Sequence, residues 1–272
     1  MSAGVPAARD GGAMTEEAHE EYDARMLTLL QIIWGDGFLS PGGPQAVRAI
    51  VAGLDLKDKT VLDIGCGLGG LDEVLAGEFG ARVTGVDVAK LIVQLGQARI
   101  AKSTLRDRIE IRLTEPGPLP FADASFDTVF GKDAWLHIPD KAGFFAEVFR
   151  VLKPRGIVTC GDWMKSPGPY GSDMEYFFKM EGLTYNLVTL AEYGQLVHGA
   201  GFDDVTLQDI TEQNAVDARD ELARMKGPLY GVLTQALGAE ARDFFIEDWR
   251  SLTVVLDQGE LRPARMRARK PR

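Results

Sequence analysis

The chain has 272 residues, of which 45% are hydrophobic and 26% charged, a composition that indicates a folded globular protein and excludes collagen-like, disordered and coiled-coil chains. The formal net charge of −10 disfavours binding to nucleic acid or to an anionic membrane surface. One basic run stands near the C-terminus, and we interpret it as a solvated edge strand or tail; it consists of Arg262, Arg265, Arg267, Arg269, Lys270 and Arg272.

The sequence shows neither a membrane span nor the apolar core of a signal peptide, so we expect a cytoplasmic protein. Its two cysteines, Cys66 and Cys160, have neither CxxC spacing nor a histidine cluster around them, so we expect no disulfide and no metal site. Residues 1–14 are expected to be disordered. Met1 and Met14 both remain possible starts.

Residues 15–53 are predicted to form a helical cap. Thr15–Leu30 has helical spacing with acidic residues in its first turn. The next segment, WGDGFLSPGG, holds four glycines in ten residues and is expected to be a structured loop. A second short helix is predicted over Pro44–Gly53.

Residues 54–272 are predicted to form one α/β domain, because strand-like and helix-like segments alternate along them. Such repeated units imply a mostly parallel sheet with helices on both faces, with LKPRG as the turn before the fifth strand. Strands are predicted at Thr60–Ile64, Arg82–Val86, Ile109–Leu113, Phe126–Phe130 and Gly156–Cys160. Helices are predicted at Gly70–Phe79, Ala89–Ala101 and Lys141–Leu152.

The C-terminal third is expected to cover the site. An insertion at about residues 163–188, rich in aromatic residues and glycine, is interpreted as a lid. After it we predict a helix at Thr189–Gly199, a strand at Asp204–Ile210, one long helical stretch at Glu212–Trp249 and an extended segment at Glu260–Arg269. The long helical stretch suits either a pocket roof or a dimer face, so the protein is expected to be a monomer or a homodimer.

A glycine-rich turn follows the first predicted strand, in the segment VLDIGCGLGG. Its glycines allow a ligand to approach the backbone closely, and Asp87 at the end of the second strand suits the two hydroxyls of a ribose. A dinucleotide would also fit such a turn. Asp63, which precedes it, favours a cationic or zwitterionic ligand.

The segments DIGCGLGG, GVDV, LPFADASFD and VLKPRG, in this order and spacing, resemble the Rossmann-like class I methyltransferases that use S-adenosylmethionine. The resemblance implies a seven-stranded, mostly parallel sheet. It also places Gly65 and Gly67 at the methionine half of the cofactor, Asp87 at the ribose and Glu115 at the adenine, where the family commonly has Asp. The full set expected at the cofactor is Ser40, Asp63, Gly65, Cys66, Gly67, Asp87, Val88, Glu115 and Lys132.

A candidate substrate loop, GKDAWLHIPD, follows the fourth strand at the edge of the sheet where ligands of α/β proteins bind. Asp133 and His137 are four residues apart, so a short helical turn would direct both toward one pocket. We expect a functional role for His137 and structural roles for His19 and His198.

A narrower resemblance covers most of the chain and is carried by WGDGFLSPGG, KDAWLHI, GDWM, LTYNLVTLAEYGQLV and LDQG. In these segments the chain is similar to the phosphoethanolamine N-methyltransferases. The resemblance implies a hydrogen-bonded pair of Tyr22 and His137 that closes the site, a pocket Asp133, a lid Tyr185 and a loop serine, Ser40. The residues expected to be catalytic are therefore His137, Tyr22 and Asp133.

Two departures from this family concern the anionic end of the substrate. Trp163 stands where the family has tyrosine, and Leu183 where it has arginine. A buried phosphate without arginine is poorly compensated, whereas a smaller zwitterion needs one cationic partner, for which Lys132, Lys165 and Lys179 are the candidates. The substrate is expected to contact Tyr22, Trp34, Asp133, Trp163 and Tyr185.

We therefore expect a small-molecule methyltransferase that converts a small zwitterion into an onium product. N-methylation of an amine or amino acid is favoured, and His137 would then accept the proton of the amine. The alternative is S-methylation of a thioether amino acid such as methionine, which needs no base. Methylation of carbon or oxygen is a third possibility. The non-enzymatic alternative is a protein that binds the cofactor but does not catalyse a reaction.

Overall fold

The computed structural model describes residues 24–272, and a seven-stranded sheet with the order β3-β2-β1-β4-β5-β7-β6 lies at its centre. The strands from β1 to β5 pair in parallel, whereas β7 is antiparallel to both β5 and β6. The predicted Rossmann-like sheet is thus confirmed. Its strands are β1 (Thr60–Ile64), β2 (Arg82–Asp87), β3 (Ile109–Leu113), β4 (Phe126–Lys132), β5 (Leu152–Lys165), β6 (Asp203–Asp209) and β7 (Leu261–Arg269).

Helices cover both faces of the sheet, which explains why the central strands are apolar runs rather than alternating patterns. One face packs against α2 (Gly43–Ile50), α3 (Gly70–Phe79) and α4 (Lys90–Ile100), and the other against α5 (Lys141–Val151) and α7 (Leu190–Gly199). Burial of side chains such as Leu75 and Phe145, both fully buried, stabilises these two layers.

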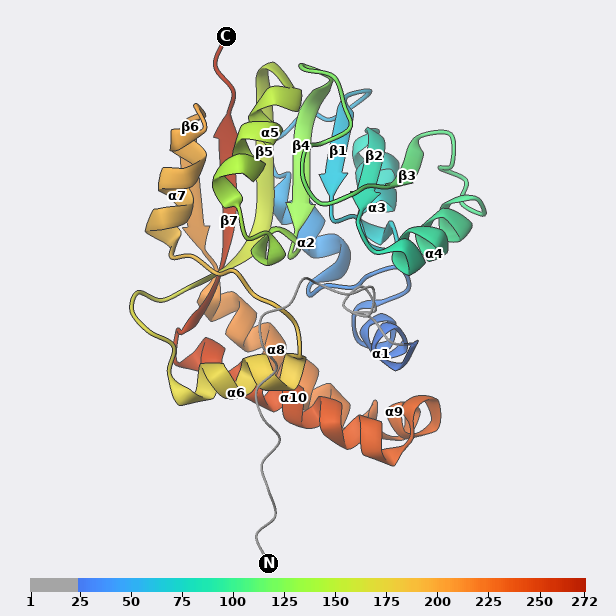
Figure 1. Cartoon of the computed structure of the whole chain (residues 1–272). Coiled ribbons are helices and arrows are strands. Elements are labelled where there is room, and N and C mark those ends of the chain that lie inside the picture. Colours follow the sequence, from blue (N-terminus) through green and yellow to red (C-terminus); the bar gives the residue numbers. More distant parts are fainter. Residues whose placement is uncertain (1–23) are drawn as a thin grey trace, which may run out of the picture.

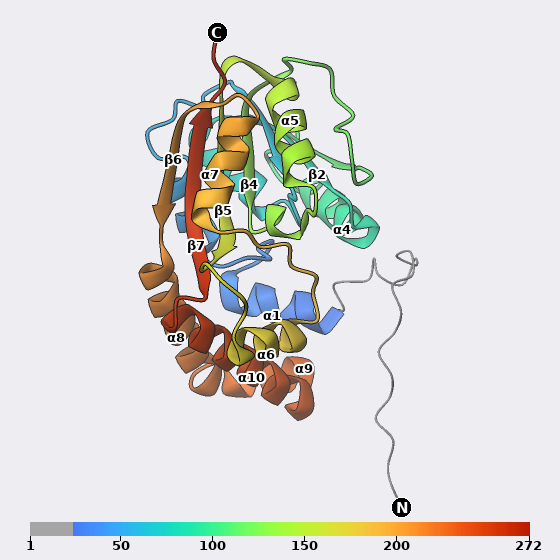
Figure 2. The same ribbon diagram turned by 60° about the vertical axis from the view of Figure 1, so that its left-hand side comes forward.

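A separate layer of helices lies beyond the carboxyl ends of β1 and β4, as Figures 1 and 2 show. It contains α1 (Ala24–Trp34), α6 (Ser172–Glu181), α8 (Thr211–Lys226), α9 (Tyr230–Leu237) and α10 (Ala239–Asp257). Ligands of open α/β sheets bind at this end, so the helical layer roofs the expected site. Among the described residues, no helix combines the length and the apolar character needed to cross a membrane.

The predicted helical stretch at Glu212–Trp249 is helical, but it is not continuous. The chain there forms α8, α9 and the first half of α10, because Gly227 and Pro228 end α8 and Gly238, at φ +85°, separates α9 from α10. Proline lacks the amide that a helix needs, and glycine accepts this positive φ without strain. The breaks fold the segment back on itself, so α10 packs against both α8 and α9.

Two further differences concern strands. The predicted turn LKPRG is a bulge inside β5: Leu152 pairs with Phe126, the next pair is Ile157 with Thr128, and Arg155 between them has φ +67°. The basic C-terminal run is not an edge strand. Its four arginines up to Arg269 lie in β7, between β5 and β6, where Arg262 forms an ion pair with Asp209 and Arg269 forms one with Asp204.

The cap and lid also differ in detail from the expected boundaries. The first helix continues to Trp34 rather than ending at Leu30, and α2 ends at Ile50, before the expected Gly53. Trp163 belongs to β5, so the insertion begins after this strand, with α6 as its main element. The expected disorder of residues 1–14, together with His19 and Tyr22, lies outside the described residues.

Candidate functional site

The glycine-rich turn between β1 and α3 has the backbone geometry expected of a close ligand contact. Gly65, Gly67 and Gly69 all have positive φ, at +85°, +57° and +80°. A Cβ atom on Gly65 would lie 2.2 Å from the Cβ of Ala134. The turn therefore needs glycine at position 65 both for its conformation and for the approach of the loop after β4.

A cluster of carboxyl groups lies beneath this turn. Asp63 at the end of β1 and Asp72 on α3 are fully buried, and their carboxyl oxygens have no hydrogen-bond partner outside the pair. Burial and the neighbouring carboxyl raise the pKa of Asp63 well above its ordinary value, and burial raises that of Asp72 to about 7. Asp63 has no exposed surface, and its raised pKa favours the protonated, neutral form.

Asp87 lies at the end of β2, next to the turn, and is partly exposed. Its carboxylate accepts hydrogen bonds from the amides of Gly67 and Ala89, both at 3.0 Å. Carboxylate oxygens have further lone pairs, so the group can still accept bonds from two hydroxyls. The glycine turn and this acceptor fit a ribose-bearing ligand such as S-adenosylmethionine.

The loop after β4 carries Asp133 and His137. The short 3-10 helix Trp135–His137 begins two residues after Asp133, which has φ +49°. Buried groups fix the loop: Asp162 accepts from the amide of Leu136 at 3.1 Å, and the Lys141 ammonium donates to the carbonyls of Trp135 and Ile138. Hydrogen bonds from Asp162 and Lys141 therefore hold the backbone of this loop in place.

The imidazole of His137 is held in one orientation. Its Nδ1 lies 2.8 Å from the carbonyl oxygen of Thr184, and its ring stacks on Tyr185 with centroids 5.4 Å apart. A carbonyl only accepts hydrogen bonds, so Nδ1 must carry the proton. The other ring nitrogen, Nε2, is then the basic atom of the neutral ring.

A small cavity of about 80 Å³ brings together most of the residues expected to contact substrate. Asp133, His137, Trp163 and Tyr185 line it, and the rings of Trp163 and Tyr185 are parallel with centroids 6.5 Å apart. The complete lining is Met26, Leu30, Trp34, Leu39, Ser40, Pro41, Asp133, Leu136, His137, Trp163, Glu181, Leu183, Tyr185, Asp248, Trp249 and Leu252.

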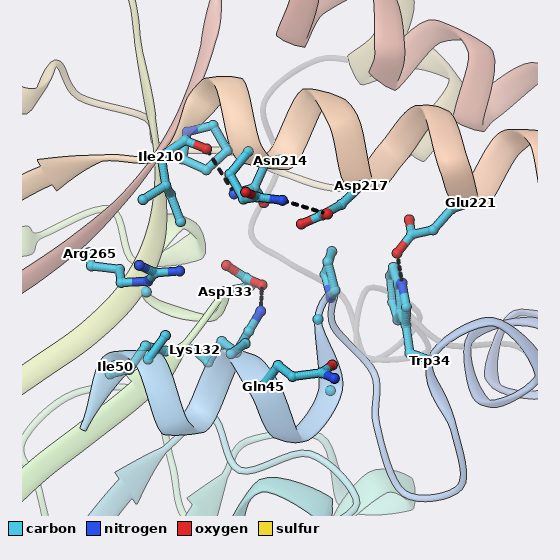
Figure 3. A pocket seen from close by; sticks show the side chains of 18 of the residues that line it. Trp34, Gln45, Ile50, Lys132, Asp133, Ile210, Asn214, Asp217, Glu221 and Arg265 are labelled. Carbon is cyan, nitrogen blue, oxygen red and sulfur yellow. Dashed lines mark hydrogen bonds and ion pairs between the residues drawn. The ribbon is translucent and has the colours of Figure 1, made fainter. Parts of the chain in front are cut away.

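A larger cavity of about 620 Å³ lies on the other side of Asp133, between α2, α8 and β7 (Figure 3). Asp133 and Trp34 line both cavities. The ammonium of Lys132 contacts the carboxylate of Asp133, and Arg265 faces the same space from β7. This cavity contains the basic groups that the small cavity lacks.

The expected cofactor residues form a second group, apart from both cavities. Leu39 lies between Gly67 and the small cavity. It lines the cavity, and its Cδ1 lies 3.3 Å from the position that a Cβ atom added to Gly67 would occupy. Val88 is 45% exposed at the end of β2, and Glu115 is exposed after β3. Lys132 and Ser40, expected at the cofactor, line the cavities instead of the glycine turn.

The candidate lysines on the lid do not line either of these cavities. The Lys165 ammonium donates to the carbonyl of Gly168 at 2.7 Å and lies over the Tyr170 ring, and Lys179 is exposed on α6. Lys132 is therefore the only one of the three sequence candidates at a cavity wall, and it already contacts Asp133.

The sequence reasoning missed three acidic residues of the helical layer. Glu181 and Asp248 line the small cavity, and Glu221 lines the large one. Glu221 accepts hydrogen bonds from the indole nitrogens of Trp34, at 2.6 Å, and Trp249, at 3.0 Å. Asp248 is one of several polar residues in α10, and no local sequence signal marks it as a cavity residue.

Comparison with known proteins agrees with this arrangement. Residues 62–160 match the family model described as a methyltransferase domain. Phosphoethanolamine N-methyltransferase 1 of Zea mays is 30% identical over 95% of this chain and 51% of its own length. The chain thus spans about half the length of these curated relatives.

Solved structures show the same fold. Phosphoethanolamine N-methyltransferase 2 of Haemonchus contortus, in complex with phosphomonomethylethanolamine and S-adenosylhomocysteine, has a TM-score of 0.85 and 25% identity, over 93% of this chain and 59% of that one. A putative sarcosine dimethylglycine methyltransferase of Galdieria sulphuraria has a TM-score of 0.74 at 23% identity, over 84% and 85% of the two chains. Residues 62–160, with the glycine turn and the acid at the end of β2, match a methyltransferase domain, and the chain as a whole resembles the phosphoethanolamine N-methyltransferases in sequence and fold.

Proposed function

We propose that this protein transfers a methyl group from S-adenosylmethionine to the nitrogen of a small amine of the ethanolamine kind, and that the product is an onium compound. The observation that carries the proposal is the His137 imidazole, fixed by the Thr184 carbonyl and the Tyr185 ring at the wall of the small cavity. The similarity to phosphoethanolamine N-methyltransferases supports the same chemistry.

The cofactor would be held at the glycine turn. The backbone of Gly65 and Gly67 would line its methionine part, and Asp87 would bind its ribose. When bound, S-adenosylmethionine supplies a methyl group on a sulfonium centre, which is reactive without further activation. The chain's own contribution is therefore to place the acceptor nitrogen and to prepare it.

His137 would prepare that nitrogen. An amine arrives protonated near neutral pH, and only its free lone pair can act as a nucleophile. Because Nδ1 donates to Thr184, Nε2 can accept the proton of the ammonium. Asp133, on the same loop, would hold the ammonium before the proton leaves, and the roof formed by α1, α6 and α10 would exclude water. The pairing of His137 with Tyr22 remains a prediction from the sequence.

The test is turnover of the full chain with methyl-labelled S-adenosylmethionine and four acceptors: ethanolamine, phosphoethanolamine, glycine and methionine. We expect methylation of amines with a rate that rises with pH, because proton loss becomes easier. His137→Ala should lower kcat by about 100-fold or more while the affinity for S-adenosylmethionine is retained. His198→Ala is the matched control, since that ring also lies near a carbonyl, at 3.3 Å from Phe202, but lines neither cavity.

Preferred turnover of methionine with a shallow pH profile would overturn N-methylation in favour of sulfonium synthesis. An unchanged kcat in His137→Ala would refute the role of the imidazole. The absence of nucleic-acid partners, the location in the cytoplasm and assembly as a monomer or homodimer are proposed from the sequence. Size-exclusion chromatography with light scattering tests the last of these.

A further inference from the structure

Two carboxyl groups form one wall of the small cavity, and the reaction proposed above uses neither of them. Glu181 is the last residue of α6, and Asp248 lies on α10, which packs directly against α6. Asp248 is 2% exposed, and its Oδ1 has no hydrogen-bond partner among the described residues. Glu181 forms a hydrogen bond with the side chain of Tyr185. An orphaned, buried carboxylate oxygen at a cavity wall calls for a donor from outside the described residues, and a bound ligand can supply one.

Carboxyl groups dominate the charged side chains of this cavity. Asp133, Glu181 and Asp248 line it, and its lining includes neither lysine nor arginine among the described residues, although Lys132 forms an ion pair with Asp133 from the side of the large cavity. The only basic side chain in that lining is the imidazole of His137. Burial raises the pKa of Glu181 to about 7, and burial together with the charge of Glu181 raises that of Asp248 to about 8. Two such carboxyls ionise together only when a cation joins them.

Aromatic rings complete the surroundings of the two acids. Tyr185 stands between His137 and Trp163, with its ring within 30° of parallel to both. The faces of such rings attract cations. Leu183, where the similar family has an arginine, is also part of the cavity lining. The cavity thus offers carboxylates and ring faces at the place where a phosphate would need guanidinium or ammonium groups.

From this arrangement we infer that Glu181 and Asp248 bind a second protonated nitrogen of the methyl acceptor, so that the substrate is a short diamine or an amine with another cationic end group. One nitrogen is methylated beside His137 and Asp133, and the other remains charged between Glu181, Asp248 and the rings. A short linker is required because the cavity is only about 80 Å³ in size. This inference rests on the proposed N-methylation and specifies its substrate class.

The experiment compares 1,2-diaminoethane with ethanolamine and phosphoethanolamine, which share its two-carbon spacer. We expect kcat/KM to be highest for the diamine. Glu181→Gln and Asp248→Asn preserve the shape of each side chain but remove its charge. Each should lower the diamine-to-ethanolamine ratio of kcat/KM about tenfold, the loss expected for one charged hydrogen bond. Glu175→Gln, exposed on the same helix α6, is the control and should leave the ratio unchanged.

Binding provides a readout that does not depend on turnover. Calorimetric titration of the full chain with 1,2-diaminoethane at pH 7.5, in two buffers of different ionisation enthalpy, should show protons released by the wild type and fewer by each variant. Preference for phosphoethanolamine, or a ratio unchanged in both variants, would overturn the inference. Diamine binding that requires Glu181 and Asp248 without methylation of any acceptor would support the cation site and overturn the proposed reaction instead.

Discussion

The contact between the glycine turn and the substrate loop leads to a quantitative prediction for Gly65→Ala. At φ +85°, an alanine at position 65 is strained, and its Cβ would lie 2.2 Å from the Cβ of Ala134. Gly53 is the matched comparison, because it has nearly the same φ, +76°, but nothing lies within 4 Å of its Cβ position. Both substitutions introduce a similar backbone strain, but only Gly65→Ala also introduces a steric overlap, with Ala134.

The expected free energies of unfolding follow from these two contributions. A left-handed alanine costs about 1–2 kcal/mol, of which about 0.4–1 kcal/mol is recovered because the unfolded chain loses freedom. Gly53→Ala should therefore destabilise the protein by roughly 1 kcal/mol. The overlap with Ala134 adds about 1–3 kcal/mol, so Gly65→Ala should cost roughly 3 kcal/mol.

Urea unfolding with linear extrapolation measures both values. The contact term can be isolated by a double-mutant cycle, because Ala134→Gly in the Gly65→Ala background removes the overlap and leaves the strain at position 65. We expect this second substitution to recover part of the lost stability. If Gly65→Ala is as mild as Gly53→Ala, or if Ala134→Gly recovers nothing, the close packing of turn and loop is refuted.

Two further predictions concern buried acids. Glu221→Ala leaves the indole donors of Trp34 and Trp249 without their acceptor and should cost about 1–3 kcal/mol per donor, whereas Glu221→Gln keeps one oxygen and should cost less; equal losses in urea unfolding would contradict this. The pKa of Asp72 is about 7 in the folded protein and its ordinary value is 3.8, so the native state binds the extra proton and stability falls as pH rises from about 4 to 7. Asp72→Asn should flatten that fall between pH 5 and pH 7.5 in urea unfolding, and an unchanged slope would refute the assignment.

The sheet could be predicted from the sequence because its signals are local. Apolar runs such as Thr60–Ile64 must lie between two layers of helices, and the glycine turn fixes where the first helix begins. The failures occurred where local signals were weak or were read in isolation. Gly227 and Pro228 break the long helix, and the bulge at Arg155 belongs to a strand because its flanking residues pair with β4. Strand pairing is a long-range property that a segment does not reveal by itself.

The substrate loop was predictable for a similar reason. Asp133 and His137 both follow β4, and the carboxyl end of a central parallel strand has a fixed place in this fold. Glu181 and Asp248 are different, because they lie 67 positions apart on two helices that meet only in the folded protein. Each looks in the sequence like an ordinary acidic helix residue. Only their shared burial at one cavity wall distinguishes them.

This difference limits how far the substrate of one methyltransferase can be inferred from that of a similar one. The glycine turn and the loop after β4 are positioned by the sheet, so their resemblance to relatives carries information about the cofactor and the reacting nitrogen. In the arrangement inferred above, the end group of the substrate contacts α6 and α10, which lie in the helical layer beyond the sheet. These helices can exchange basic for acidic residues without disturbing the sheet. A chain can therefore keep the methyl-transfer geometry of phosphoethanolamine N-methyltransferases while Leu183, Glu181 and Asp248 select a different end group.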